Sequence, residues 1–155
     1  VNDDDMIAAL ESGRVAKYVT DFPNDKIALV HNVIALPHLG ASTPESEENC
    51  ARMAADQLKD YLINGNIKNS VNLPNVHQDW SGISRVCLIH KNIPAMLTKI
   101  TTILSDEGVN VENLTNKSKK DYAYTMVDLN GRIKDAVADE LRAIPGMIRV
   151  RVINH

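Results

Sequence analysis

Two hydrophobic periodicities alternate along the second half of the chain. Apolar residues at every second position or in short runs predict strands at 86–90, 109–115, 122–129 and 147–153. Apolar residues three and four apart predict helices at 94–107 and 133–144. The polar stretch 116–121 is predicted to be a loop between the two middle strands. This order predicts an α+β ferredoxin-like βαββαβ domain over residues 84–155.

The first part of the chain has a different pattern, in which short apolar runs lie between turn residues. A helix is predicted at 2–12, because Asn2 can cap its first turn and three aspartates follow. Strands are predicted at 14–21 and 32–36, with a loop between them. The order of these elements predicts a parallel α/β arrangement, in which strand ends deliver functional groups.

A long helix is predicted after these strands. It begins at Thr43 and Pro44, a cap residue followed by proline at the first helical position, and it runs to about residue 63. Its predicted inner side comprises Cys50, Met53, Ala54, Leu58, Tyr61 and Leu62. We therefore expect an α/β region at 1–65. Residues 66–83, with Asn, Pro, Gly and Ser and no long periodic run, are predicted to be a linker.

Composition narrows the classes of function. The formal net charge of −3 argues against a nucleic-acid-binding protein, which needs a basic face. No apolar run reaches the roughly 18 residues of a membrane span. The two cysteines, Cys50 and Cys87, lie far apart and fit neither a metal-binding nor a disulfide pattern. We expect both to be reduced, which is typical of a cytoplasmic protein, and we expect no metal site.

His38 is the first candidate for chemistry. It lies between a predicted strand end and a helix start, with Pro37 and Gly40 restricting the backbone around it. Histidine titrates near neutral pH and can exchange a proton if a carboxylate orients its ring. Asp21 and Asp25, in the loop after the preceding strand, are the available carboxylates. Residue spacing alone leaves a second interpretation open, a surface histidine without a role.

Two segments carry a resemblance to known families. Leu-Pro-His-Leu-Gly-Ala-Ser-Thr, residues 36–43, looks like the catalytic-histidine segment of the NAD-dependent D-2-hydroxyacid dehydrogenases. Residues 84–155 resemble the ACT regulatory domain. The combination implies an α/β remnant of a Rossmann-like core followed by an ACT domain, as the C-terminal part of a longer enzyme. That enzyme is expected to oxidise 3-phosphoglycerate with NAD.

The resemblance also implies roles for single residues. His38 would give or take the proton while hydride moves to the nicotinamide. Asp25 stands where the family places the glutamate that orients the histidine, one methylene shorter. Asp21, Gly40 and Ala41 match positions beside the cofactor, as does His38 itself. None of the glycines forms a Gly-x-Gly turn, so this chain alone is not expected to bind NAD tightly or to turn over substrate.

The ACT resemblance implies an effector site. His90 and Asn92, with Asn110 further on, match residues that bind L-serine in the serine-sensing enzymes of the family. Ala95 stands where those enzymes have a glycine that admits the ligand. The same resemblance implies a homo-oligomer formed through paired ACT domains. Two alternatives stay open: a structural dimerisation domain without an effector, and a free-standing amino-acid-binding module.

Overall fold

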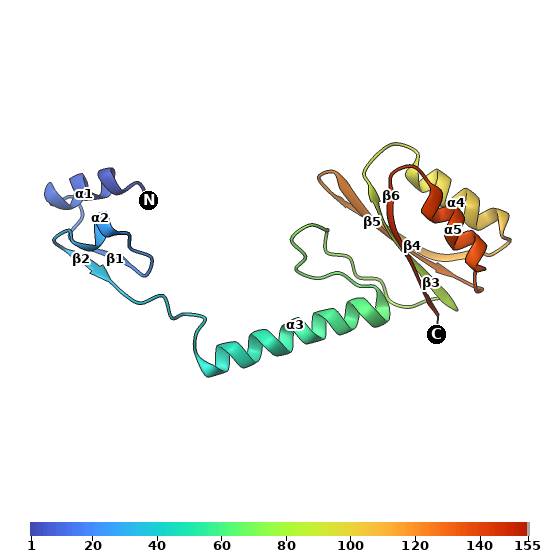
Figure 1. Cartoon of the computed structure of the whole chain (residues 1–155), viewed down its shortest axis with the longest axis horizontal. Coiled ribbons are helices and arrows are strands. Elements are labelled where there is room, and N and C mark those ends of the chain that lie inside the picture. The colour runs from blue at the N-terminus through green and yellow to red at the C-terminus, as the bar shows by residue number, and fades with distance from the viewer. Residues whose placement is uncertain (155) are drawn as a thin grey trace. The chain divides into compact units, whose positions relative to one another are not determined.

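The computed structural model describes residues 1–154. The chain divides into two compact units, Val1–Arg52 and Met53–His155. Figure 1 shows the elements of each unit along the chain, coloured from the N-terminus to the C-terminus. Each unit is described by itself below.

The first unit is a small parallel α/β arrangement, as its sequence predicts. It consists of α1 (Asp3–Glu11), β1 (Tyr18–Thr20), α2 (Asp25–Ala28) and β2 (Val33–Ala35). The two strands pair in parallel, with Thr20 opposite Ala35. Helix α2 replaces part of a predicted loop. Asn24 makes it possible, because its side-chain oxygen accepts hydrogen bonds from the backbone N–H groups of Lys26 (3.1 Å) and Ile27 (3.0 Å).

The first unit buries little apolar surface. Leu10 on α1 and Ile27 on α2 are its only buried hydrophobic side chains within the described residues. Several large apolar side chains are instead exposed, among them Phe22 (81%), Leu29 (90%) and Leu39 (57%). The two-stranded sheet therefore has apolar residues that find no partner in the described part of this unit.

A long helix, α3 (Pro44–Asn64), follows. It begins where the sequence predicts, since Thr43 Oγ1 accepts a hydrogen bond from the N–H of Ser46 at 3.2 Å. The predicted inner side is not buried: none of the residues of α3 is classed as buried, and Met53, Leu58 and Leu62 are each more than half exposed. The C-terminal turns of α3, from Met53 onward, belong to the second unit.

The second unit has the predicted βαββαβ order. Its elements are β3 (Ser84–Lys91), α4 (Met96–Asp106), β4 (Val111–Lys119), β5 (Tyr122–Leu129), α5 (Asp135–Ala143) and β6 (Met147–Asn154). The strands form one antiparallel sheet in the order β4-β5-β3-β6, which confirms the ferredoxin-like prediction. Strand β4 is longer than predicted, because residues 116–119 pair with residues 122–125 of β5 instead of forming a loop.

The two faces of this sheet are covered differently. Helices α4 and α5 pack on one face over a core that includes Leu88, Ile100 and Leu141, each fully buried. The opposite face is covered by residues 61–80, the end of α3 and the segment predicted to be a linker. Ile67 and Val76 pair in an isolated antiparallel bridge and pack with buried Cys87, Tyr124 and Met126. This segment is thus packed against the sheet and buries apolar side chains there.

Candidate functional site

His38 and Asp21 lie together because their strands are parallel. The carboxyl ends of β1 and β2 reach the same edge of the sheet, where the N–H of Leu36 donates to the carbonyl of Thr20 at 2.9 Å. One residue beyond Thr20 and two beyond Leu36, the side chains meet, with Nδ1 of His38 at 3.1 Å from Oδ2 of Asp21. Both side chains are more than half exposed. The second ring nitrogen, Nε2, makes no hydrogen bond within the described residues.

The surroundings of His38 fix its ring further. The ring of Phe22 meets it edge-on, with centroids 5.3 Å apart and an interplanar angle of 85°. The backbone at Gly40 is open, since a Cβ there would meet nothing within 4 Å, and Ala41 follows it as an exposed residue. Asp25, the other predicted partner, is the first residue of α2 and makes no ion pair with His38 within the described chain. The carboxylate that faces the imidazole is that of Asp21.

The predicted effector residues Asn92 and Asn110 lie at opposite ends of the sheet. The backbone N–H of Asn92 donates to the backbone carbonyl of Asp121, just before β5, at 2.8 Å. The backbone carbonyl of Asn110 accepts from the backbone N–H of Asn130, just after β5, at 3.0 Å. Nine residue steps of extended chain separate Asp121 from Asn130, or about 30 Å. One copy of the chain therefore does not bring these two side chains together.

His90 is almost completely buried, with 2% of its surface exposed. Its Nδ1 lies 2.8 Å from the carbonyl oxygen of Lys91, and its Nε2 lies 2.8 Å from Oγ1 of Thr125. Thr125 in turn donates to Oδ1 of Asn116 on the edge strand β4, also at 2.8 Å. Both ring nitrogens thus already have partners inside the protein.

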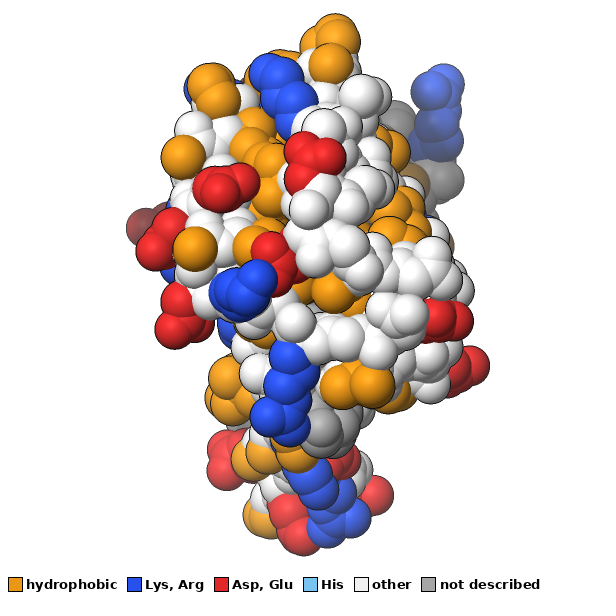
Figure 2. Space-filling view, turned by 90° about the vertical axis from the view of Figure 1, so that its right-hand side faces the viewer, with side chains coloured by type: hydrophobic (Ala, Val, Ile, Leu, Met, Phe, Trp, Pro, Cys, Tyr) orange, Lys and Arg blue, Asp and Glu red, His pale blue; other side chains and the backbone are white. Residues whose placement is uncertain are grey.

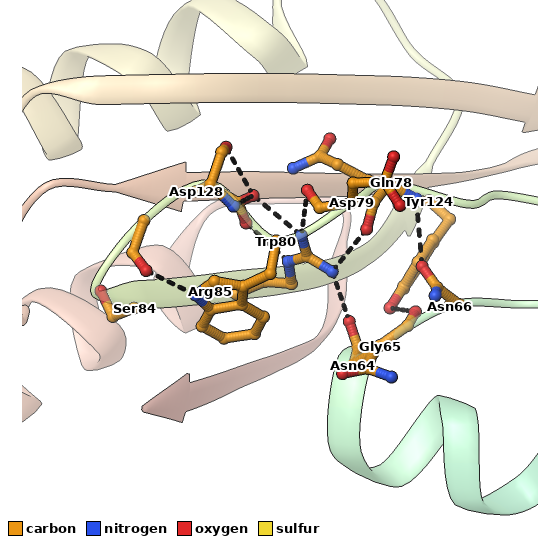
Figure 3. Close-up of polar contacts among 12 residues, drawn as sticks. Asn64, Gly65, Asn66, Gln78, Asp79, Trp80, Ser84, Arg85, Tyr124 and Asp128 are labelled. Carbon is orange, nitrogen blue, oxygen red and sulfur yellow. Dashed lines mark hydrogen bonds and ion pairs between the residues drawn. The ribbon is translucent and has the colours of Figure 1, made fainter. Parts of the chain in front are cut away.

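The most completely hydrogen-bonded side chain is Arg85, at the start of β3. Its guanidinium donates to both carboxylate oxygens of Asp128, at 2.5 and 2.8 Å, and both side chains are fully buried. It also donates to the backbone carbonyls of Asn64 (2.7 Å), Gln78 (3.0 Å) and Asp79 (3.0 Å). All five of its N–H donors are therefore used. Figure 3 shows this group, which we call the Arg85 cluster: Arg85, Asp128 and the three carbonyls.

The Arg85 cluster contains a buried ion pair between the Arg85 guanidinium and the Asp128 carboxylate. Burial opposes ionisation of Asp128, but hydrogen bonds and the positive charge of Arg85 outweigh it, so the pKa of Asp128 lies below its ordinary value. The backbone N–H and the hydroxyl of Ser81 also donate to this carboxylate, at 3.1 and 3.0 Å. The guanidinium carbon lies 4.6 Å from the ring centroid of Trp80. The cluster therefore joins two strands to the covering segment.

A second arginine anchors the end of α3. Nη2 of Arg151 donates to the carbonyls of Tyr61 and Leu62, at 2.7 and 2.6 Å, and the guanidinium stacks on the ring of Tyr61. Together with the Arg85 bond to Asn64, three of the last four carbonyls of α3 accept from arginine. The carbonyl of Tyr61 also accepts from the N–H of Gly65 at 3.0 Å, and all three carbonyls lie at the negative end of the helix dipole.

Sequence reasoning missed the Arg85 cluster. A signal was present, because Arg85 and Asp128 each interrupt an apolar strand and carry opposite charges. They are also cross-strand partners, Arg85 opposite Asp128, once β3 and β5 pair in antiparallel register. The register was not known from the sequence, so the two charges could not be matched.

Outside the clusters described above, the surface of the described residues has few polar groups that converge on one point. Figure 2 shows apolar side chains exposed among charged ones on the side of the molecule that it presents. A shallow apolar groove lies between α4 and α5, lined by Thr98, Thr102, Ile103, Ala143 and Ile144 among others. Residues 1–154 hold no group of three or more His, Cys, Asp or Glu side chains arranged for a metal ion. In the same residues no helix is both long and apolar enough to cross a membrane.

Comparison with known proteins points to one kind of enzyme. No protein-family model matches the chain. A D-3-phosphoglycerate dehydrogenase of Escherichia coli K12 is 32% identical over 124 residues, which are 79% of this chain and 30% of that protein. D-3-phosphoglycerate dehydrogenase 2 of Saccharomyces cerevisiae is 32% identical over 131 residues, 79% of this chain and 27% of that protein. The Dictyostelium discoideum enzyme of the same name is 27% identical over 157 residues, covering 94% of this chain and 38% of itself.

Among solved structures, the ACT domain from GTP pyrophosphokinase of Chlorobium tepidum matches 45% of this chain and 95% of its own, with 16% identity and a TM-score of 0.40. The fold defines the class: a parallel α/β segment, which carries the His38–Asp21 pair, followed by a ferredoxin-like α+β domain. Its sequence relatives are D-3-phosphoglycerate dehydrogenases, which confirms the resemblance predicted from the sequence. The chain spans about a third of the length of these relatives.

Proposed function

We propose that this chain is part of an NAD-dependent D-3-phosphoglycerate dehydrogenase, which oxidises 3-phosphoglycerate to 3-phosphohydroxypyruvate for L-serine biosynthesis in the cytoplasm. The observation that carries the proposal is the His38–Asp21 contact at the carboxyl ends of two parallel strands. Similarity to enzymes of that name supports the substrate. The two free cysteines fit a reducing compartment.

His38 is the proton-transfer group in this proposal. Oxidation of a secondary alcohol requires that the hydroxyl proton leave as hydride departs from the same carbon. The Asp21 carboxylate can only accept a hydrogen bond, so the Nδ1 atom that faces it carries a hydrogen and Nε2 is the atom that accepts the proton. The edge-on ring of Phe22 limits rotation of the imidazole.

NAD would accept the hydride when bound. The residues present suit its nicotinamide end: an exposed His38–Asp21 pair beside the open backbone of Gly40 and Ala41. A Gly-x-Gly turn for its phosphates does not occur in this sequence, so the longer enzyme must supply that contact. We favour Asp21 over Asp25 as the residue that orients His38, because Asp25 forms no ion pair with that side chain within the described residues.

The test uses the complete dehydrogenase with three single variants. His38→Ala should lower kcat by about 10²–10⁴-fold, because a general base typically contributes that factor. Asp21→Asn should lower kcat and alter its pH profile, whereas Asp25→Asn should change kcat less than threefold, roughly. If Asp25→Asn lowers kcat more than Asp21→Asn does, Asp25 is the residue that orients His38. A His38→Ala enzyme within a few-fold of the original kcat would overturn the proposal.

For the second unit we infer an L-serine site that two copies of the chain complete. Asn92 and Asn110 are both exposed but lie about 30 Å apart within one copy. A two-fold axis that pairs the edge strands β4 antiparallel would bring Asn110 of each copy toward Asn92 of the other. A small zwitterion would then be held by two carboxamides and by backbone N–H groups near the start of α4.

Mixing of variants tests this arrangement. Asn92→Ala and Asn110→Ala homodimers should each bind no serine in a calorimeter. After subunit exchange, half of the sites in each heterodimer have both asparagines, so binding should reappear at about one site per heterodimer. The matched control is the double variant mixed with itself, which stays silent. If the mixture does not bind although the original chain does, each site is formed within one copy.

The alternative is a structural dimerisation domain without an effector. One observation favours it: both ring nitrogens of His90 are already hydrogen-bonded inside the protein. Ala95, the residue just before α4, has a φ of 65° and carries a methyl group where a glycine would admit a ligand. A folded dimer that gives no heat with millimolar L-serine would select this alternative.

A further inference from the structure

A row of hydrogen bonds crosses three strands of the second unit. It runs from the carbonyl of Lys91 through the ring of His90 to the hydroxyl of Thr125, and from there to the carboxamide of Asn116. The strands are β3, β5 and β4, so the row begins in the interior of the sheet and ends on its edge strand. His90 and Thr125 are buried, whereas Asn116 is exposed.

We propose that Thr125 is a positioning residue that fixes the ring of His90 and couples its hydrogen bonding to the orientation of Asn116 on the edge strand. The proposal rests on the serine site above for its regulatory meaning, because the sequence resemblance groups His90 with Asn92 and Asn110, and His90 lies two residues before Asn92. The row itself is independent of serine, since it is formed entirely by residues of one copy.

The coupling follows from counting hydrogen atoms. The carbonyl of Lys91 can only accept, so Nδ1 of His90 must carry a proton. The hydroxyl of Thr125 has a single hydrogen and two partners. When that hydrogen goes to Oδ1 of Asn116, Nε2 must donate to the hydroxyl, and the ring, which then carries protons on both nitrogens, is an imidazolium. When Nε2 carries no proton, the hydroxyl donates to the ring and Asn116 must turn its NH₂ group toward Thr125.

The exposed side of Asn116 therefore depends on the state of a ring two strands away. In the first arrangement its NH₂ group is presented to the surroundings, and in the second its oxygen is presented. A donor suits a carboxylate and an acceptor suits an ammonium or hydroxyl group. Because β4 is an edge strand, this change is displayed where a second copy or an effector would approach.

Burial explains why the row has to be complete. His90 is only 2% exposed, so water has little access to its Nε2. Without the Thr125 hydroxyl, Nε2 would be a buried polar atom with no hydrogen-bond partner, which is costly. Thr125 is itself fully buried, opposite Leu88 on β3 and Asn116 on β4. Valine has nearly the shape of threonine and lacks the hydroxyl, which makes Thr125→Val the direct test.

The experiment records ¹⁵N spectra of the His90 ring and of the Asn116 side-chain amide, followed by calorimetry with L-serine. Asn116→Leu should shift the Nε2 resonance of His90, although the two side chains do not contact each other in the row. Thr125→Val should shift both signals and weaken serine binding about tenfold or more. Thr125→Ser should restore both signals and the affinity. Thr115→Val, the same change one residue from Asn116 on β4, is the matched control and should alter neither.

The outcomes separate the two proposals. If the original chain binds no serine but Asn116→Leu and Thr125→Val shift the His90 signal and Thr125→Ser does not, the row stands and the serine site falls. If the original chain binds serine and these variants leave both signals and the affinity unchanged, the row is overturned and the serine site stands. Asn116 is exposed, so Asn116→Leu keeps the test valid even where Thr125→Val fails to fold.

Discussion

The two units of this chain contain similar kinds of apolar residue and use them differently. Of the buried hydrophobic side chains in the described residues, two lie in Val1–Arg52 and eighteen in Met53–His155. The second unit closes a four-stranded sheet on both faces, whereas the first pairs two three-residue strands. A two-stranded sheet leaves too little apolar area buried to offset chain entropy. We infer that the second unit has enough buried apolar surface to be self-supporting, whereas the first unit by itself does not.

The two cysteines provide the largest expected contrast between the units, since each unit has one. Cys50 is exposed, and Cys87 is buried with its pKa raised by burial. If the second unit has a stability of at least about 5 kcal/mol, Cys87 should react with a thiol reagent about 10³-fold or more slowly than Cys50. Reaction time courses of Cys50→Ser and Cys87→Ser measure both rates. Similar rates in the two variants would contradict the self-supporting second unit.

Ion pairs provide the next contrast. Arg85→Ala leaves the buried carboxylate of Asp128 unpaired, and we expect a loss of about 3–5 kcal/mol in the free energy of unfolding. Urea unfolding followed by the fluorescence of Trp80, the only tryptophan, measures it. Lys26→Ala removes the exposed pair with Asp4 in the first unit and should leave this midpoint unchanged. A loss for Arg85→Ala below about 1 kcal/mol would be inconsistent with the pairing described.

Leucine truncations test the packing itself. Leu88→Ala removes a fully buried side chain of the second unit and should cost about 2–5 kcal/mol. Leu29→Ala removes one that is 90% exposed in the first unit and should change stability by less than about 0.5 kcal/mol. Both are measured by urea unfolding with far-UV circular dichroism. Equal costs would show that Leu29 is covered in solution.

Acidification should have the smallest effect over the ordinary pH range. The folded-state pKa of Asp128 is lowered, so its contribution to stability is present above the unfolded value of about 3.9 and is lost as pH falls through the folded value. The urea midpoint reported by Trp80 should therefore be insensitive to this group between pH 5 and 8, roughly, and should fall below about pH 4. Asp139→Asn, at an exposed pair with Arg142, is the control and should have the same profile. If the urea midpoint of the original chain already falls between pH 7 and 5, and this fall is absent from Asp139→Asn, the acid sensitivity belongs to Asp139.

Local sequence patterns predicted most elements of the second unit. Strand β5 has the predicted bounds, 122–129, because six of its eight residues are apolar and the turn residues Asn130 and Gly131 follow it. Strand β4 was cut short in the prediction because its last residues, Asn-Lys-Ser-Lys, are polar. They form a strand because β5 offers a hydrogen-bonding partner, and a sequence window does not contain that partner.

The first site was half predicted. The sequence identified His38 and offered Asp21 and Asp25 as partners, and the family resemblance assigned the orienting role to Asp25 and a place beside the cofactor to Asp21. In the structure Asn24 caps α2, and Asp25 is the first residue of that helix. Parallel pairing of β1 and β2 then brings Asp21 to 3.1 Å from His38.

By itself, the sequence determined the element order, the ferredoxin-like arrangement and the histidine at a strand end. These depend on periodicity, caps and turn residues, which act over a few neighbouring positions. Only the tertiary structure decided that Arg85 pairs with Asp128, that residues 61–80 cover the sheet, and that His90 is bonded on both sides. The Arg85–Asp128 pair and the His90–Thr125 bond join residues 43 and 35 positions apart, and they exist because a specific strand register brings these side chains together.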